Sequence, residues 1–231
     1  MFESFKVRAA LINHQKGDLE KARATYNELY AAGYIRCSYI IPWSILLLRE
    51  GGEENFKKVK EILAKAQKAS DIDPANRTQL LTNFAVANFK LGDVDKAVEL
   101  MERTHQNRPC GTTYGTLGYL YIEQGDAEKA LEFNQKALEY DDEDPVIIDN
   151  IGQIHYRLLG DKEKALAYFQ KAHELKDTQI DTLWFLSRYD IENGDTEAAI
   201  EKLEKTLEGR FSPLNYVTRD IVKAEIDHLR G

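Results

Sequence analysis

The sequence predicts an all-α fold, a solenoid of about six helical hairpins closed by a C-terminal capping helix. Three observations predict it. A glycine recurs about every 34 residues, five of these glycines open the same short phrase, and most follow a pair of one bulky and one small residue. A fixed period in this range indicates a repeat architecture, in which each unit packs on its neighbours.

The glycines are separated by 34, 41, 33, 35 and 34 residues. Each ends an apolar run, where a residue with positive φ often closes a helix. In the phrase Gly-Asp-x-x-x-Ala, the Asp can cap the next helix and the small Ala lets two antiparallel helices approach closely. The glycines are Gly17, Gly51, Gly92, Gly125, Gly160 and Gly194, and all but Gly51 open the phrase.

A bulky apolar residue followed by a small one lies eight or nine residues before most of these glycines. Alternation of large and small side chains lets successive hairpins interlock at the density of a protein interior. The pairs are Phe84-Ala85, Leu117-Gly118, Ile151-Gly152 and Leu186-Ser187, with weaker versions at Ala9-Ala10 and Trp43-Ser44.

The repeat register predicts one solenoid domain over residues 1–231. The second hairpin is about seven residues longer than the others, which predicts a second helix from Glu53 to Ser70 or a wider loop. The fifth has one extra residue before Gly160, and Ser212-Pro213 predicts the start of the closing helix, 213–230. The predicted hairpins are 3–36, 37–77, 78–110, 111–144, 145–179 and 180–212.

Two of these hairpins closely resemble the tetratricopeptide repeat (TPR), whose 34 residues carry a bulky residue, Leu-Gly, Tyr, Ala, an aromatic, Ala and Pro at set spacings. The resemblance extends over nearly the whole chain. The resemblance implies a right-handed superhelical solenoid in which the first helix of each hairpin lines a concave groove. It also implies an adaptor protein of bacterial type, but it does not identify the ligand. The matching residues are Tyr114, Leu117, Gly118, Tyr121, Ala130, Ala137 and Pro145, then Ile151, Gly152, Ala165, Phe169 and Ala172.

Composition and charge exclude several classes. Apolar residues at 43% and charged residues at 30% favour a folded chain, and a net charge of −8 disfavours nucleic-acid binding. Residues 1–110 hold 17 Lys and Arg against 14 Asp and Glu, whereas residues 111–231 hold 14 against 25. This asymmetry of +3 and −11 predicts a solvated acidic surface, or a polar rod whose ends attract each other or steer a basic ligand.

The sequence contains no recognisable catalytic or metal-binding motif. The five histidines lie in separate repeats without zinc-ligand spacing, and no phosphate-binding loop, nucleophile elbow or dinucleotide fingerprint occurs. Residues 141–144 are acidic but lack the pattern of a calcium loop, so an exposed loop is favoured. We therefore expect no enzyme, cofactor or metal. Cys37 and Cys110 have no pairing pattern, which fits a reducing, cytoplasmic location.

Candidate binding residues lie on the helix face that the resemblance places in the groove. An asparagine directly before the bulky–small pair often bonds a peptide backbone in TPR proteins, and aromatic and Arg side chains are typical anchors. Tyr and Trp at this spacing also fill joints between hairpins. The candidates are Asn83, Tyr119, Asn150, Gln153, Tyr156, Arg157, Trp184, Arg188, Ile45 and Leu48, followed by Phe89, Lys90, Glu123 and Asp149.

One TPR binding mode is disfavoured. Chaperone-binding TPR domains hold a C-terminal carboxylate with two Asn and with Lys and Arg from successive first helices. With Asn83 as the central Asn, the basic positions fall on Thr112 and Thr116; with Asn150, they fall on Asp181 and Phe185. Because none of these is basic, we do not expect a chaperone tail as the ligand.

The stretch Tyr39–Leu48 is apolar, but its ten residues are well short of the roughly 20 that cross a bilayer. The register makes it the first helix of the second hairpin, with Ser38 as cap and Pro42 in or just past the first turn. Ile41, Ile45 and Leu48 should then lie on the groove side. Either other segments of the chain cover them, or they form an apolar floor for a partner.

The favoured hypothesis is a non-enzymatic adaptor that holds a peptide or helix of an unidentified protein partner, without nucleic acid or direct membrane insertion. A self-assembling scaffold is the first alternative, because the charge is uneven and the N-terminal end is uncovered. The second is a regulatory or anchored fragment of a larger membrane-associated protein. The first helix begins without a cap, so we expect a native leading segment, an anchor being one form of it.

Overall fold

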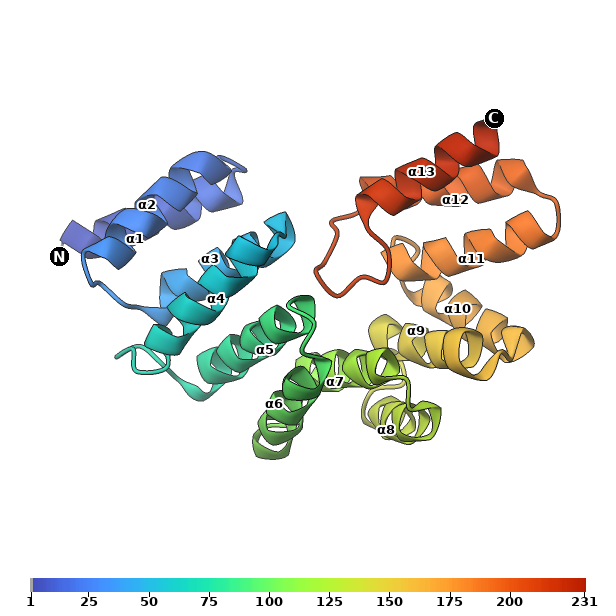
Figure 1. The fold of residues 1–231 in the computed structure, drawn as a ribbon, viewed down its shortest axis with the longest axis horizontal. Helices are drawn as coiled ribbons and strands as arrows, with labels where there is room; N and C mark the ends of the chain where they lie inside the picture. The colour runs from blue at the N-terminus through green and yellow to red at the C-terminus, as the bar shows by residue number, and fades with distance from the viewer. Residues whose placement is uncertain (1) are drawn as a thin grey trace. The chain divides into compact units, whose positions relative to one another are not determined.

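The computed structural model describes residues 2–231, and α-helices connected by short loops form this part of the chain, with no β-strand in it (Figure 1). The all-α class is therefore confirmed. The helices are α1 (Phe2–Gln15), α2 (Leu19–Ala31), α3 (Cys37–Glu50), α4 (Glu53–Ala66), α5 (Pro74–Lys90), α6 (Val94–Asn107), α7 (Gly111–Gln124), α8 (Ala127–Tyr140), α9 (Pro145–Gln153) with its π-helical continuation η1 (Ile154–Leu159), α10 (Lys162–Leu175), α11 (Ile180–Glu192), α12 (Thr196–Glu208) and α13 (Arg219–Arg230).

The helices form two compact units, residues 1–108 (unit 1) and 109–231 (unit 2). Within each unit, consecutive helices pack in pairs: α1 on α2, α3 on α4 and α5 on α6 in the first, then α7 on α8, α9 on α10 and α11 on α12 in the second. The first helices of neighbouring pairs also contact each other, as α3 and α5 do in unit 1 and α7 and α9 in unit 2. Each unit is therefore built as a stack of hairpins.

The repeated phrase acts as its chemistry predicts. All six marker glycines have φ between 67° and 85°, a region that only glycine enters without strain. The alanine that ends the phrase is fully buried in each of its five occurrences, at 22, 97, 130, 165 and 199. Four of the aspartates cap the next helix by accepting a backbone N–H, whereas Asp18 instead pairs with Lys21 Nζ at 2.6 Å. The four caps are Asp93, Asp126, Asp161 and Asp195.

Helix α3 is capped from elsewhere in the chain, so the predicted Ser38 cap is wrong. The Asp71 carboxylate accepts the backbone N–H groups of Cys37 at 2.8 Å and Ser38 at 3.0 Å. Two acceptors on one carboxylate satisfy more of the unpaired N–H groups at this helix start than one hydroxyl could. Asp71 lies in the connection between α4 and α5, so the extra residues of the second hairpin form a wider loop and not a longer helix.

The apolar stretch Tyr39–Leu48 lies on α3 and packs against other helices on nearly all its sides. Helix α3 contacts α1, α2, α4 and α5, and the rings of Tyr39 and Trp43 pack against Tyr26. Leu48 is 4% exposed and Ile45 is half-buried. Covering by the chain itself therefore accounts for most of this surface. Across the described residues, no helix has both the length and the apolar character needed to span a bilayer.

The extra residue of the fifth hairpin is accommodated in a π-helical turn at the end of the α9 helix. After α9 the chain continues as η1, and Asp161 N–H donates to the His155 carbonyl at 2.9 Å across Gly160. A π-helical turn absorbs one additional residue without breaking the helix, so the repeat register is restored at Asp161.

The predicted start of the closing helix at 213 is wrong, because α13 begins at Arg219 after a Thr218 cap. Residues 209–218 form an irregular loop instead. The Asp181 carboxylate accepts the Tyr216 N–H at 3.0 Å and the Asn215 side-chain amide at 3.0 Å. These bonds hold the backbone of the loop out of helical geometry.

Candidate functional site

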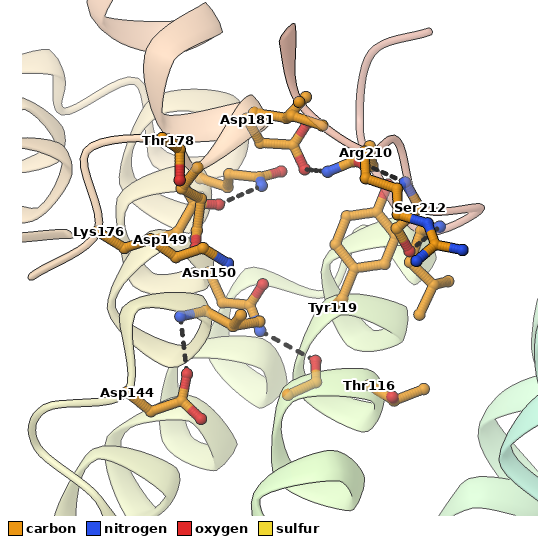
Figure 2. Close-up of a pocket in the computed structure, with 18 of the residues that line it drawn as sticks. Thr116, Tyr119, Asp144, Asp149, Asn150, Lys176, Thr178, Asp181, Arg210 and Ser212 are labelled. Atoms are coloured by element: carbon orange, nitrogen blue, oxygen red, sulfur yellow. Dashed lines mark hydrogen bonds between the residues drawn. The ribbon is translucent and has the colours of Figure 1, made fainter. Parts of the chain in front are cut away.

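A cavity of about 820 Å³ lies within unit 2. Helices α7 and α9, the start of α11 and the loop 209–218 enclose it, and Figure 2 shows side chains from these elements pointing toward one space. The predicted candidates that line it are Tyr119, Asn150 and Gln153, with Asp149 from the further set. Pockets of this size are typical of small-ligand and peptide sites.

Two buried carboxylates lie at this cavity. Asp149 accepts Thr182 Oγ1 at 2.5 Å and Gln153 Nε2 at 2.7 Å, while Asp181 binds the loop at Asn215 and Tyr216. Burial raises the pKa of both carboxyl groups, and the negative charge of Asp181 raises the pKa of Asp149 further. Neither forms an ion pair with any Lys or Arg in the part of the chain that the structure describes.

A chain of hydrogen bonds runs from α7 through α9 to α11. Glu123 Oε1 accepts Arg157 Nη2 at 2.7 Å, and Arg157 Nη1 donates to Gln153 Oε1 at 2.9 Å. Gln153 then donates to Asp149, which accepts from Thr182. Gln153 and Arg157 therefore join the first helices of three neighbouring hairpins, a structural role that sequence reasoning did not assign to them.

The asparagine of the fifth hairpin is fixed at one end only. Asn150 Nδ2 donates to the Gly115 carbonyl at 3.1 Å and to Asn134 Oδ1 at 3.2 Å. Among the described residues nothing donates to Asn150 Oδ1, and this atom remains able to accept. Asn134 in turn lies so close to Gly118 that an added Cβ there would be 2.3 Å from Asn134 Oδ1.

The equivalent asparagine in unit 1 is occupied at both ends. Asn83 Nδ2 donates to Ser44 Oγ at 2.8 Å, and Asn83 Oδ1 accepts Gln79 Nε2 at 2.8 Å. Asn83 is 4% exposed. Its amide therefore holds α5 to α3, the helix that also carries Ile45 and Leu48.

The remaining candidates form an aromatic and basic cluster in unit 2. Arg157 lies over the Tyr216 ring at 4.2 Å, and Arg188 lies over the Trp184 ring at 4.0 Å. Arg188 also pairs with Glu225 of α13 at 2.7 Å. Tyr156 packs against Phe185 at 5.1 Å between ring centroids. In the further set, Phe89 and Lys90 lie on α5 in unit 1, half-buried.

Sequence reasoning missed several residues at the cavity. The sequence analysis named Asp181 and Thr116 only as positions that lack the basic residue of a chaperone-binding TPR domain. It did not single out Gln179, Lys176 or Arg210. One signal could have found Asp181: like Asp149, it is a lone carboxylate inside an apolar run of a first helix, where burial is expected. The loop residues could not be found, because their approach depends on the fold of 209–218.

No cluster of three or more His, Cys, Asp or Glu side chains with metal-binding geometry occurs in residues 2–231 as described. The free thiol of Cys37 is buried, and burial raises its pKa to about 11, so it is unreactive at neutral pH.

Residues 111–144 and 147–179 each match the family model of the tetratricopeptide repeat. The chain has the tetratricopeptide repeat fold. These two matches span the α7–α8 hairpin and nearly all of the α9–α10 hairpin, whose first helices line the cavity. No curated protein matches this chain in sequence.

Solved bacterial structures extend the likeness in fold to nearly the whole chain. A TPR protein from Parabacteroides merdae is 10% identical with a TM-score of 0.78, over 99% of this chain and 84% of that one. TTC0263, a TPR protein of Thermus thermophilus, is 18% identical with a TM-score of 0.58, over 99% and 98%. PilF of Pseudomonas aeruginosa is 14% identical with a TM-score of 0.61, over 96% and 97%. At these identities the likeness shows the fold alone.

Proposed function

We propose that the TPR chain is a non-enzymatic adaptor and that the cavity of unit 2 holds an extended segment of a partner protein. Stacked helical hairpins create extended binding surfaces, and TPR proteins commonly act as interaction scaffolds. The observation that carries the proposal is the cavity itself, about 820 Å³ between the first helices of two TPR hairpins, with polar groups aimed into it.

Asn150 gives the cavity a group suited to a peptide. Its amide nitrogen is held by Gly115 and Asn134, so the side chain is pre-oriented before binding. Its oxygen is left to accept a backbone N–H of the incoming segment. A pre-oriented group loses little side-chain entropy on binding, which favours affinity.

Site-specific photo-crosslinking tests this proposal. A benzophenone amino acid replaces Thr112, which is exposed at the edge of the cavity, and in a matched control it replaces Gln135, which is exposed on the second helix of the same hairpin. From position 112 we expect adducts to one partner protein, and these adducts should map to one short segment of it. From position 135 we expect no adduct to that partner.

Two results would overturn the proposal. Either the two positions capture the same proteins in equal yield, or position 112 gives no adduct in cells where affinity capture of the intact chain recovers a partner.

Self-association is a second candidate function, and the exposure of two apolar residues on α1 favours it. Phe5 is 67% exposed and Ile12 is 39% exposed. The uneven charge of +3 and −11 would add attraction between unlike ends of neighbouring copies. Sedimentation of the wild type and of Phe5→Glu at low and high salt tests it: a monomer at high protein concentration and low salt contradicts self-association.

A further inference from the structure

We propose that the cavity of unit 2 recognises a single cationic side chain of the partner segment, an arginine guanidinium or a lysine ammonium. This rests on the proposed function and specifies the ligand chemistry of the same site. The argument begins with the balance of hydrogen-bond donors and acceptors around the cavity.

The carboxylates at the cavity have unused capacity. A carboxylate accepts about four hydrogen bonds, whereas Asp149 accepts two, both from neutral groups. Asp149 is 3% exposed and Asp181 is 6% exposed, and no cation of the described chain pairs with either. Two buried, unpaired carboxylates are costly, and an incoming cation would offset that cost.

An independent observation at the same cavity comes from Gln179. Its amide nitrogen donates to the Pro145 carbonyl at 2.9 Å, which fixes the orientation of the amide. Its oxygen Oε1 is buried and accepts no hydrogen bond from the described residues, although the side chain is only 8% exposed. A buried acceptor without a donor is unusual in folded proteins, and it points to a donor supplied by a ligand.

The buried groups at this cavity with unused hydrogen-bonding capacity are therefore all acceptors. Asn150 Oδ1 and Gln179 Oε1 join the two carboxylates, and the four come from α9, α11 and the connection before α11. A guanidinium carries five N–H donors and an ammonium three, and neither carries an acceptor. These four acceptors are buried, whereas the cations Lys176 and Arg210 lie exposed at the edge, so a donor-rich cation is the group that the buried part of the cavity fits.

The charges at the edge of the cavity indicate where this cation comes from. Lys176 and Arg210 are exposed cavity-lining residues, and Figure 2 shows them on opposite sides of Asp149 and Asp181. These two charges repel a ligand that carries several cations, such as a polyamine. They favour one basic residue flanked by acidic residues, as a partner segment can supply.

The test starts from peptides selected on the intact chain. Dodecapeptides are selected from a random library, and the tightest binders are synthesised with each Arg replaced by citrulline and each Lys by acetyl-lysine. These replacements keep the shape and remove the charge. Calorimetry then compares wild type with Asp149→Asn/Asp181→Asn and with Asp220→Asn, an exposed carboxylate outside the cavity as the matched control.

We expect one neutralised position to weaken binding to wild type by at least about tenfold, because a buried charged hydrogen bond is lost. In the double variant this difference should disappear, and in Asp220→Asn it should persist. If the double variant does not fold, Thr112→Arg replaces it: the added charge should weaken the cationic peptide and leave its neutral twin unchanged.

The outcomes separate the two proposals. Peptides that bind the cavity without any loss on neutralisation overturn the cation proposal and leave the adaptor function standing. Failure to select any peptide counts against both. Spermidine that displaces the peptide at equal concentration assigns the site to free polyamines and overturns the partner side chain as its source.

Discussion

At the scale of single residues, the site is defined by polar groups that the chain buries without full compensation. Asp149 and Asp181 are buried and accept hydrogen bonds only from neutral donors, and Gln179 Oε1 accepts none from the described residues. Such groups reduce the stability of the empty protein, and the same groups give a binding site its selectivity. Stability and recognition are therefore linked at these positions, and both are measurable.

The raised pKa of Asp149 predicts a pH-dependent contribution to stability. Its carboxyl holds a proton in the folded chain at pH values where the unfolded chain has lost it, so the free energy of unfolding falls as pH rises from about 4 to about 7. The charged groups that face it are Asp181 and Arg157.

Asp149→Asn removes this titration. Relative to wild type, its free energy of unfolding should rise by at least about 1 kcal/mol between about pH 4 and about pH 8, as measured by urea unfolding. Asp220→Asn should show no such trend. A difference between variant and wild type that stays constant with pH would show that Asp149 titrates normally.

Gly118 gives a second residue-scale prediction. A Cβ at this position would lie 2.3 Å from Asn134 Oδ1, whereas a Cβ at Gly115 would lie 3.3 Å from the exposed Val146 side chain. Gly118→Ala should therefore lower the free energy of unfolding by about 2 kcal/mol or more and disturb the contact of Asn134 with Asn150. Gly115→Ala on the same helix should cost less than about 1 kcal/mol, because alanine favours the helix. Equal melting temperatures would contradict this packing account.

At the scale of elements, the departures from the repeat pattern all have identifiable physical causes. The extra residue of the fifth hairpin becomes η1, and the extra residues of the second form the loop that carries Asp71. The periodicity predicts these hairpins because glycine, cap and small residue act locally. It does not predict the start of α13, because a carboxylate 34 residues upstream, Asp181, holds that segment.

A single substitution tests the cap of α3. Asp71→Ala removes both acceptors for the Cys37 and Ser38 N–H groups and should cost about 1–2 kcal/mol of stability. Asp142→Ala, in an exposed loop, is the matched control and should change stability by less than about 0.5 kcal/mol. Chemical denaturation measures both; an unchanged midpoint for Asp71→Ala would exclude the cap.

At the scale of the whole molecule, the sequence predicts the class of fold better than the site. The residues that specify each repeat lie within one short stretch of sequence, so composition and spacing are enough to predict the TPR fold. Of the predicted site residues, Tyr119, Asn150 and Gln153 line the cavity, whereas the Arg157 guanidinium binds Glu123 and Gln153. Helical spacing cannot tell a side chain that faces a ligand from one that bonds the next hairpin, because both point to the same side.

The division into two compact units gives a prediction about folding. Because unit 2 has its own core and contains the whole cavity, we expect fragment 109–231 to be helical by circular dichroism and to unfold in one cooperative transition. A fragment without a cooperative transition would show that unit 2 depends on residues 1–108.

The most direct test of the central claim observes the cavity amides during binding. In a ¹⁵N–¹H NMR titration of the intact chain with a selected peptide, the side-chain NH₂ signals of Asn150 and Gln179 should shift in proportion to bound peptide. The NH₂ signals of Asn83, in unit 1, should stay in place. Shifts at Asn83 with none at Asn150 and Gln179 would contradict the assignment of the binding site to this cavity.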